Sequence, residues 1–140
     1  MARRGPIREE FALATDAVGD ARILRVSGDI DLATAPRLGV HAGELIRNDG
    51  CDVVVDLREA TAIDSTAMGV LLNVCRRATR AGLGFAVICP DGPLRRPLEI
   101  ARLLDTLRVQ RTESDALRCV ERVREAGRAR RDGMASRPAG

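Results

Sequence analysis

The sequence predicts an α/β fold in which a mixed, partly parallel sheet of about five strands is covered by about four helices. Two apolar runs, DVVVDL at 52–57 and GFAVIC at 84–89, are typical of central strands that are buried on both faces. Helical patterns alternate with strand patterns along the chain, in the order ββαβαβαβα. The length of 140 residues and the hydrophobic content of 45% suit one domain with its own core.

The first half of the chain predicts two strands and a helix before the first buried run. Residues 10–28 predict two strands joined by a turn at Gly19-Asp20. Residues 33–50 predict a helix that Thr34 can cap and that tolerates Pro36 in its first turn. We expect this helix to end at Asn48-Asp49-Gly50.

The second half repeats the alternation of strands and helices. We expect a helix at about 66–81 that stops at Gly82, and a shorter helix at 93–107. An edge strand at 108–112 and a last helix capped by Thr112 or Ser114 complete the pattern.

The two ends of the chain differ in composition from the middle. Residues 1–8 are expected to be a flexible N-terminus, and 128–140 (RARRDGMASRPAG) an Arg-rich disordered tail. The domain is therefore expected to span 9–127.

Composition excludes several functions. Aromatic residues make up 1% of the chain and all 23 basic residues are Arg, so stacking platforms for single-stranded nucleic acid and lysine chemistry are not expected. The net charge of +3 comes from the C-terminal segment, where six Arg in 122–140 face two acids. We therefore expect no direct nucleic-acid partner.

The sequence shows no recognisable targeting signal. No segment resembles a signal peptide or reaches transmembrane length, and the four cysteines have no metal or redox spacing. We expect a soluble cytoplasmic protein with buried thiols and no membrane partner, and the sequence leaves the oligomeric state open.

The sequence offers no catalytic set. The single histidine, His41, lies on the polar side of a predicted helix, and no second base accompanies it. Asp29, Asp31 and Asp64 form only an unspecific metal pattern, so no metal site is predicted. We expect a protein that is not an enzyme and carries no cofactor.

One loop stands out because hydroxyls follow a carboxylate at the start of an apolar helix. In VVVDLREATAIDSTAMGVLL (53–72), Asp64 or Ser65 can cap the helix by accepting backbone N–H groups. The N-terminus of a helix also accommodates a phosphate, so Ser65 can equally be a phosphorylation switch. Physical reasoning alone leaves both interpretations open.

The same stretch resembles the signature of the STAS domain found in bacterial anti-sigma factor antagonists. That signature is an apolar strand, an Asp, a phosphorylatable Ser and a Gly four residues later, matched here by Asp64, Ser65 and Gly69. A second stretch, SGDIDLATAPRL (27–38), resembles the acidic loop and Thr-Ala-Pro of the family. The resemblance covers about 9–125, and its order of elements agrees with a STAS-like single domain.

The resemblance implies a partner and a mechanism. The unphosphorylated protein would bind an anti-sigma factor that is also a serine kinase and so release a sigma factor; phosphorylation would end binding and a serine phosphatase would restore it. Ser65 would be the phosphoacceptor, with Thr66 as second choice. The implied partner-binding residues are Asp29, Asp31, Thr34, Asp64, Ser65, Thr66, Met68 and Gly69.

The chain departs from the family at two points, and an alternative function stays open. Ser65-Thr66-Ala67 replaces the commoner Ser-Ser-Gly or Ser-Ala-Gly, which adds a second hydroxyl, and Asp29 replaces the commoner Glu. STAS domains also serve as accessory subunits of membrane lipid or anion transporters. Such subunits generally need no phosphoacceptor, which counts against that function here.

Overall fold

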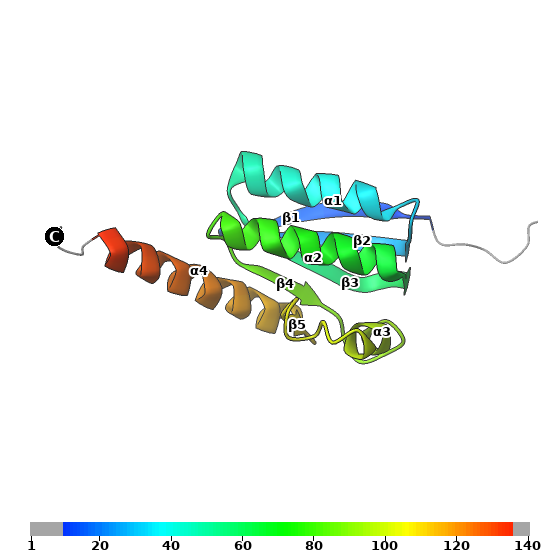
Figure 1. The fold of residues 1–140 in the computed structure, drawn as a ribbon. Helices are drawn as coiled ribbons and strands as arrows, with labels where there is room; N and C mark the ends of the chain where they lie inside the picture. The colour runs from blue at the N-terminus through cyan, green and yellow to red at the C-terminus, as the bar shows by residue number, and fades with distance from the viewer. Residues whose placement is uncertain (1–9, 136–140) are drawn as a thin grey trace, which may run out of the picture.

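The predicted α/β fold is present in the computed structural model, which describes residues 10–135. The sheet consists of five strands, which are β1 (Ala12–Val18), β2 (Ala21–Ile30), β3 (Asp52–Ile63), β4 (Phe85–Ile88) and β5 (Val109–Gln110). The helices are α1 (Ala35–Glu44), α2 (Ser65–Arg80), α3 (Arg95–Ile100) and α4 (Glu113–Ala135), and a π-helical turn, Leu45–Asp49, extends α1. Figure 1 shows α1 at the top, α2 below it in front of the strands, and α4 along the lower side.

The strands lie in the sheet in chain order, from β1 to β5. β1 is antiparallel to β2, and every later pair is parallel, with α1, α2 and α3 as the connections. Because parallel strands end at the same edge of a sheet, the loops that follow β2 and β3 emerge next to each other. This topology brings the two stretches that the sequence singled out to one place.

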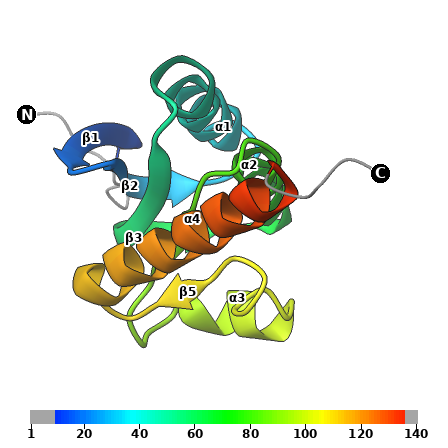
Figure 2. The same ribbon diagram turned by 90° about the vertical axis from the view of Figure 1, so that its left-hand side faces the viewer.

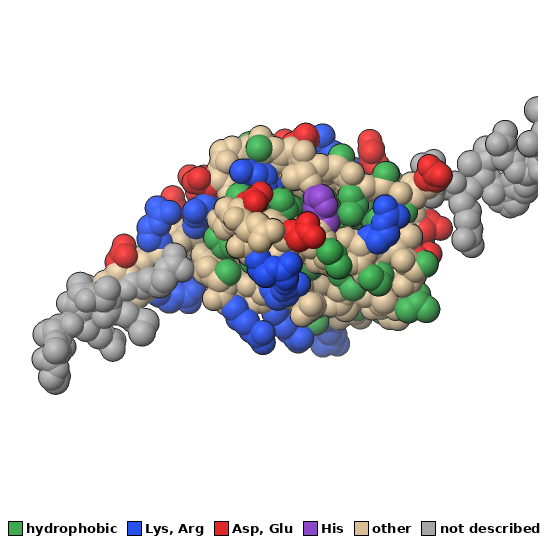
Figure 3. Space-filling model, turned by 90° about the horizontal axis from the view of Figure 1, so that it is seen from above, with side chains coloured by type: hydrophobic (Ala, Val, Ile, Leu, Met, Phe, Trp, Pro, Cys, Tyr) green, Lys and Arg blue, Asp and Glu red, His purple; other side chains and the backbone are tan. Residues whose placement is uncertain are grey.

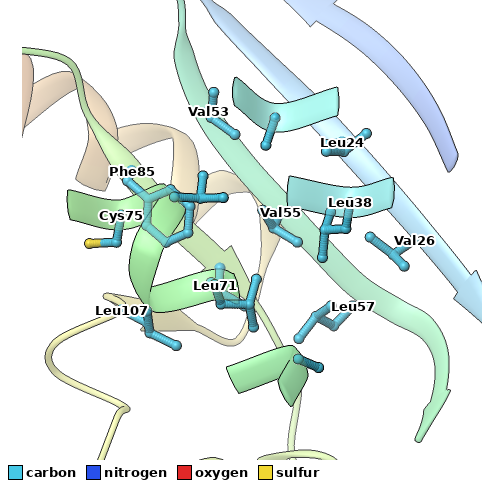
Figure 4. Packing of buried hydrophobic residues seen from close by; sticks show 14 of the residues in the cluster. Leu24, Val26, Leu38, Val53, Val55, Leu57, Leu71, Cys75, Phe85 and Leu107 are labelled. Atoms are coloured by element: carbon cyan, nitrogen blue, oxygen red, sulfur yellow. The ribbon is translucent and has the colours of Figure 1, made fainter. Parts of the chain in front are cut away.

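The core has two layers, one on each face of the sheet. The larger layer lies under α1 and α2, and Figure 4 shows Leu38 and Leu71 from these helices meeting Val55 and Phe85 from the sheet. The smaller layer lies under α4. All four residues of β4 are buried, as are 52–57 in β3, so both runs predicted to be central strands are confirmed.

Helix α4 lies directly on the backbone of the strand connection at Gly84. A Cβ at this position would lie 2.5 Å from the carbonyl oxygen of Val120, so only glycine fits. The buried carboxylate of Asp52 accepts the N–H of Gly84 at 2.8 Å, and Arg124 Nη1 lies 3.5 Å from its other oxygen. Burial raises the pKa of the Asp52 carboxyl, although the hydrogen bond from Gly84 and the positive charge of Arg124 act against that rise. Backbone contact and one buried charge pair therefore fix α4 on the sheet.

The Arg-rich C-terminal segment differs from its prediction. Residues 128–135 are helical and continue α4, where the sequence predicted disorder from 128 onward. Arginine and alanine are good helix formers, and they carry the helix past Gly127 and Gly133 once α4 is anchored on the sheet. The remaining tail, 136–140, and the predicted flexible segment 1–8 lie outside the described residues.

Several element boundaries also differ from the prediction. The helix expected at 93–107 is the short α3, because Arg102 takes a left-handed conformation (φ 58°) and the Leu103 N–H turns back to Leu98. The edge strand expected at 108–112 is only the two residues of β5. By contrast, β3 continues beyond 57 to Ile63, because it stays paired with β2 through two register shifts.

Two predicted helix ends, a stop and a cap, are confirmed. Gly50 ends the π-helical turn in a left-handed conformation (φ 60°), as the stop at Asn48-Asp49-Gly50 predicted. Of the two caps proposed for α4, Thr112 accepts the N–H of Asp115 at 3.1 Å.

Replacing Gly84 tests the backbone contact between α4 and the sheet. Gly84→Ala is expected to lower the free energy of unfolding by about 1–3 kcal/mol, since the added methyl group overpacks this contact. Gly133→Ala is the matched control, because a Cβ there meets nothing within 4 Å. Urea unfolding of the three proteins measures the effect, and an unchanged midpoint for Gly84→Ala would contradict the packing described.

Candidate functional site

The site forms where the ends of β2 and β3 meet. The backbone N–H of Asp64, directly after β3, donates to the carbonyl of Ile30 at the end of β2 at 3.2 Å. Asp64 has an extended backbone (φ −109°, ψ −177°), and α2 begins at the next residue. The last strand pairing therefore aligns the start of α2 with the β2–α1 loop.

The carboxylate of Asp64 joins these two segments. Its Oδ1 accepts the N–H of Ala67 at 2.9 Å, which confirms the predicted N-cap of α2. Its Oδ2 accepts the N–H of Leu32, in the β2–α1 loop, at 3.2 Å. One side chain thus caps a helix and holds the neighbouring loop against it.

The β2–α1 loop is ordered by its own side chains. Asp31 Oδ1 accepts the N–H groups of Ala33 and Thr34 at 3.0 and 3.1 Å, which closes a tight turn. The Thr34 hydroxyl accepts the N–H of Asp31 at 2.9 Å and donates to the carbonyl of Asp29 at 2.7 Å. These bonds hold the loop in a single shape before α1 begins.

Thr34 corrects one expectation from the sequence. It occupies the N-cap position of α1, but its side chain makes no capping bond to that helix. Its hydroxyl is instead fully used inside the loop, and the fixed backbone of Pro36 helps to begin the helix. Thr34 therefore shapes the loop that faces α2 and leaves α1 uncapped by a side chain.

A second contact joins the two strands just below the loops. The hydroxyl of Thr61 in β3 donates to Asp29 Oδ1 in β2 at 2.5 Å. Together with the bond from Leu32 to Asp64, this contact fixes the β2 and β3 ends at two points. The surface beside Ser65 is consequently built on a rigid base.

The outer surface of the site combines one hydroxyl with apolar groups. Ser65 is exposed, and its hydroxyl makes no hydrogen bond within residues 10–135. One turn later Gly69 is exposed, and a Cβ there would meet nothing within 4 Å. Met68 is half-buried against the core, whereas the Leu32 side chain is 74% exposed. An unused hydroxyl therefore stands beside uncovered apolar surface.

The structure brings the sequence-predicted residues together, and it adds two others. Asp29, Asp31, Thr34 and Asp64 form the network at the base of the site. The remaining predicted residues, Ser65, Thr66, Met68 and Gly69, lie in the first turns of α2. Sequence reasoning missed Leu32 and Thr61, although an apolar residue within the polar loop DLAT was a signal that its side chain had no core to enter.

Other candidate chemistry lies elsewhere. The ring of His41 is hydrogen-bonded through Nε2 to the hydroxyl of Thr15 in β1 at 2.8 Å, so it belongs to the α1–β1 contact. Within residues 10–135 no group of three or more His, Cys, Asp or Glu could hold a metal ion. No helix in that part of the chain has the length and apolar character needed to cross a membrane.

Comparison with known families now decides the class of this domain. The sequence model of the STAS domain matches residues 12–116. The chain belongs to the STAS domain family. Membership of this non-enzymatic regulatory family supports the expectation that the chain is not an enzyme.

Two curated relatives of this STAS domain carry the same kind of name. The anti-sigma-F factor antagonist RsfB of Mycobacterium tuberculosis is 28% identical over 95 residues, covering 68% of this chain and 77% of the relative. An anti-sigma F factor antagonist of Paenibacillus polymyxa is 28% identical over 102 residues, covering 72% of this chain and 87% of the relative.

Solved structures confirm the fold. An anti-sigma factor antagonist from Mycobacterium paratuberculosis superposes with a TM-score of 0.72 at 25% identity, covering 80% of this chain and 95% of that one. A sulfate transporter family protein from Wolinella succinogenes shares the fold with a TM-score of 0.64 at 19% identity, covering 79% of this chain and 92% of that one. The STAS fold by itself therefore does not separate a regulator from a transporter component.

Replacing Asp64 tests the two hydrogen bonds that its carboxylate accepts, from the N–H groups of Ala67 and Leu32. Asp64→Ala removes both acceptors and is expected to lower the free energy of unfolding by about 0.5–2 kcal/mol, the usual cost of losing an N-cap. Asp64→Asn keeps one acceptor oxygen, which we expect to accept the Ala67 N–H. The free energy of unfolding should therefore fall less in Asp64→Asn than in Asp64→Ala. In both variants the Leu32 amide should exchange hydrogen faster than in the wild type; an unchanged exchange rate would show that Asp64 does not hold the loop.

Proposed function

We propose that this STAS domain is an anti-sigma factor antagonist whose binding is switched off by phosphorylation of Ser65. The observation that carries the proposal is the exposed Ser65 hydroxyl, which is unused within residues 10–135 and stands at the start of α2. The names of the two curated relatives support the general role of anti-sigma factor antagonist, without the phosphorylation switch.

The proposed partner is an anti-sigma factor that is also a serine kinase. Binding it in the unphosphorylated state releases a sigma factor, and the site supplies apolar contact through Leu32 and Met68. Gly69 lets a partner approach the α2 backbone closely, because no side chain covers that turn. Ser65 is exposed one helical turn before Gly69, within reach of a kinase bound to the same surface.

Phosphorylation changes charge without requiring a change of fold. The Ser65 oxygen attacks the terminal phosphorus of a nucleotide held by the kinase; its proton passes to the kinase, and the nucleoside diphosphate leaves. The new group adds about −1.5 to −2 charges next to the carboxylate of Asp64. Burying that charge in an apolar interface is costly, so the partner is released. A serine phosphatase hydrolyses the ester and restores binding.

The surroundings of the two hydroxyls favour Ser65 over Thr66. Ser65 is exposed, whereas Thr66 is half-buried in the first turn of α2. A kinase active site must reach the acceptor oxygen directly, so the exposed side chain is the better substrate. We place this reaction in the cytoplasm, where a sigma factor and its regulators act.

Substitutions at Ser65 test the switch. Ser65→Ala should bind the purified anti-sigma factor kinase with unchanged affinity and should take up no phosphate. Ser65→Asp should bind about tenfold or more weakly, because a carboxylate replaces the hydroxyl in the interface. Titration calorimetry and phosphate incorporation from labelled ATP measure the two effects.

Thr66→Ala serves as the matched control for these variants. It should be phosphorylated like the wild type, because Ser65 is kept. Phosphorylation that persists in Ser65→Ala and disappears in Thr66→Ala would move the acceptor to Thr66. No binding by any of the proteins would favour the transporter accessory subunit.

Gly69→Ala tests whether Gly69 serves the partner or the fold. The methyl group meets nothing inside the molecule, so the free energy of unfolding should rise by up to about 1 kcal/mol. Affinity for the anti-sigma factor should fall, because the methyl group stands on the contact surface. Gly133→Ala should leave affinity unchanged. Full affinity for Gly69→Ala would place the partner elsewhere.

A further inference from the structure

The outer edge of the sheet at β1 is open. β1 is first in the strand order and pairs only with β2, and Figure 2 shows it at the margin of the sheet. Within residues 10–135 no segment pairs with its outer side. Because a strand directs alternate backbone groups to each side, β1 presents unpaired N–H and C=O groups along its seven residues.

β1 lacks the features that usually protect an edge strand. Proteins blunt such edges with Lys, Pro, a bulge or a very short strand. β1 reads ALATDAV, and it pairs with β2 in a continuous register from Ala12 to Val18. Its one charged residue, Asp16, is already paired with Arg25 of β2. The opposite edge strand, β5, has only two residues, so β1 is the edge suited to pairing.

We propose that β1 pairs with β1 of a second copy of this chain, antiparallel about a two-fold axis at Thr15. In this register Thr15 faces its own copy, Ala14 faces the partner's Asp16, and Leu13 faces the partner's Ala17. The two sheets join into one sheet of ten strands. The contact is isologous, so it closes at a dimer.

Charge complementarity favours a second copy over a foreign strand. Ala14 lies opposite Arg25 of β2, and in the dimer it lies opposite the partner's Asp16 on its other side. Each Arg25 already contacts Asp16 of its own chain and lies 3.5 Å from Asp56 and 3.8 Å from Glu113. In the dimer it also faces the partner's Asp16 in one cross-strand row, at a Cα separation of about 10 Å across two strand spacings. The small side chain of Ala14 leaves room for Arg25 to reach over it. The two-fold axis repeats this row, and no like charges lie directly opposite each other.

The face that carries this row is hollow around Ala14 and Arg25. α4 packs against β3, β4 and β5 and also covers Ala21 and Ile23 at the start of β2, whereas no β1 residue belongs to its buried cluster. A hollow of about 600 Å³ lies there, and Ala14, Arg25 and Asp56 are among its lining residues. Joining the sheets extends this open face, so the new ion pairs meet no obstruction.

The opposite face offers apolar surface beside the same edge. Leu13, Val40 and His41 line a groove of about 480 Å³ between β1 and α1, and the Val40 side chain is 60% exposed. Figure 3 looks onto the α1 side and shows hydrophobic side chains beside the histidine. A second copy adds the partner's Ala17 next to Leu13 and narrows this groove. Ser65 lies on another element, so the dimer keeps both proposed partner surfaces.

Cysteine cross-linking tests the register. The two Cβ atoms at position 15 are about 4.5–5.5 Å apart when they lie directly opposite each other, close enough for a disulfide after a small shift. Thr15→Cys should therefore form a covalent dimer under mild oxidation, seen as twice the mass without reductant. The four native cysteines are buried, so the wild type should not cross-link.

Ala17→Cys is the matched control on the same exposed strand. The two positions 17 are four residues out of register, about 14 Å apart, which is too far for a disulfide. The wild type should sediment as a concentration-dependent monomer–dimer mixture. Equal cross-linking of both variants, no cross-linking of Thr15→Cys, or a wild type that is monomeric at every concentration would overturn the proposed dimer.

A charge exchange provides an independent test of the Arg25 row. Asp16→Arg and Arg25→Asp should each sediment as monomers, because like charges then face each other across the two-fold axis. Mixing the two variants should restore a heterodimer, in which both rows again pair opposite charges. Arg58 keeps its bond to Asp56 at 2.6 Å in both, and circular dichroism checks the fold. Two folded variants that stay monomeric when mixed would refute the proposed pairing of Arg25 with the partner's Asp16.

Discussion

The carboxylate of Asp64 is the interaction on which the proposed site depends. It accepts one N–H from the first turn of α2 and one from the β2–α1 loop, so two segments that lie 32 residues apart in the chain share a single anchor. Parallel pairing of β2 with β3 brings the loops close, and the carboxylate turns that proximity into a fixed geometry. Because Asp64 holds both the start of α2 and the β2–α1 loop, a change at Ser65 alters the surface while these segments keep their positions.

The same geometry explains why a small chemical change can act as a switch. Asp29, Asp31 and Thr34 use their polar atoms inside the loop network, whereas Ser65 presents a hydroxyl unused within residues 10–135. The same surface carries the exposed side chain of Leu32, whose N–H is bound to Asp64, the residue before Ser65. A phosphate there adds charge to an apolar contact without breaking an internal bond. The proposed dimer through β1 would present two such surfaces on one sheet.

Much of the fold could be predicted from the sequence, because the decisive signals were local. The buried runs in β3 and β4, the Asp64 cap and the stop at Gly50 follow from residue type and short spacing. Thr34 is a local exception, since its hydroxyl is used by the Asp29 carbonyl only five residues earlier in the same loop. The failure at α4 depended on contacts between residues far apart in the chain, because Gly84 and Asp52 anchor the helix that continues to Ala135. Leu32 and Thr61 were missed for the same reason, since only the paired strand ends show their partners.

The phosphorylation state of Ser65 in the native host tests the central proposal most directly. Trypsin cleaves after Arg58 and Arg76, so one peptide, 59–76, contains both Ser65 and Thr66. Fragment mass spectra of that peptide, taken from growing and from stressed cells, distinguish the two hydroxyls. We expect one phosphate, located on Ser65, in one condition and its loss in the other. A peptide that is unmodified in every condition would contradict the switch and leave a STAS domain that binds its partner without regulation at this residue.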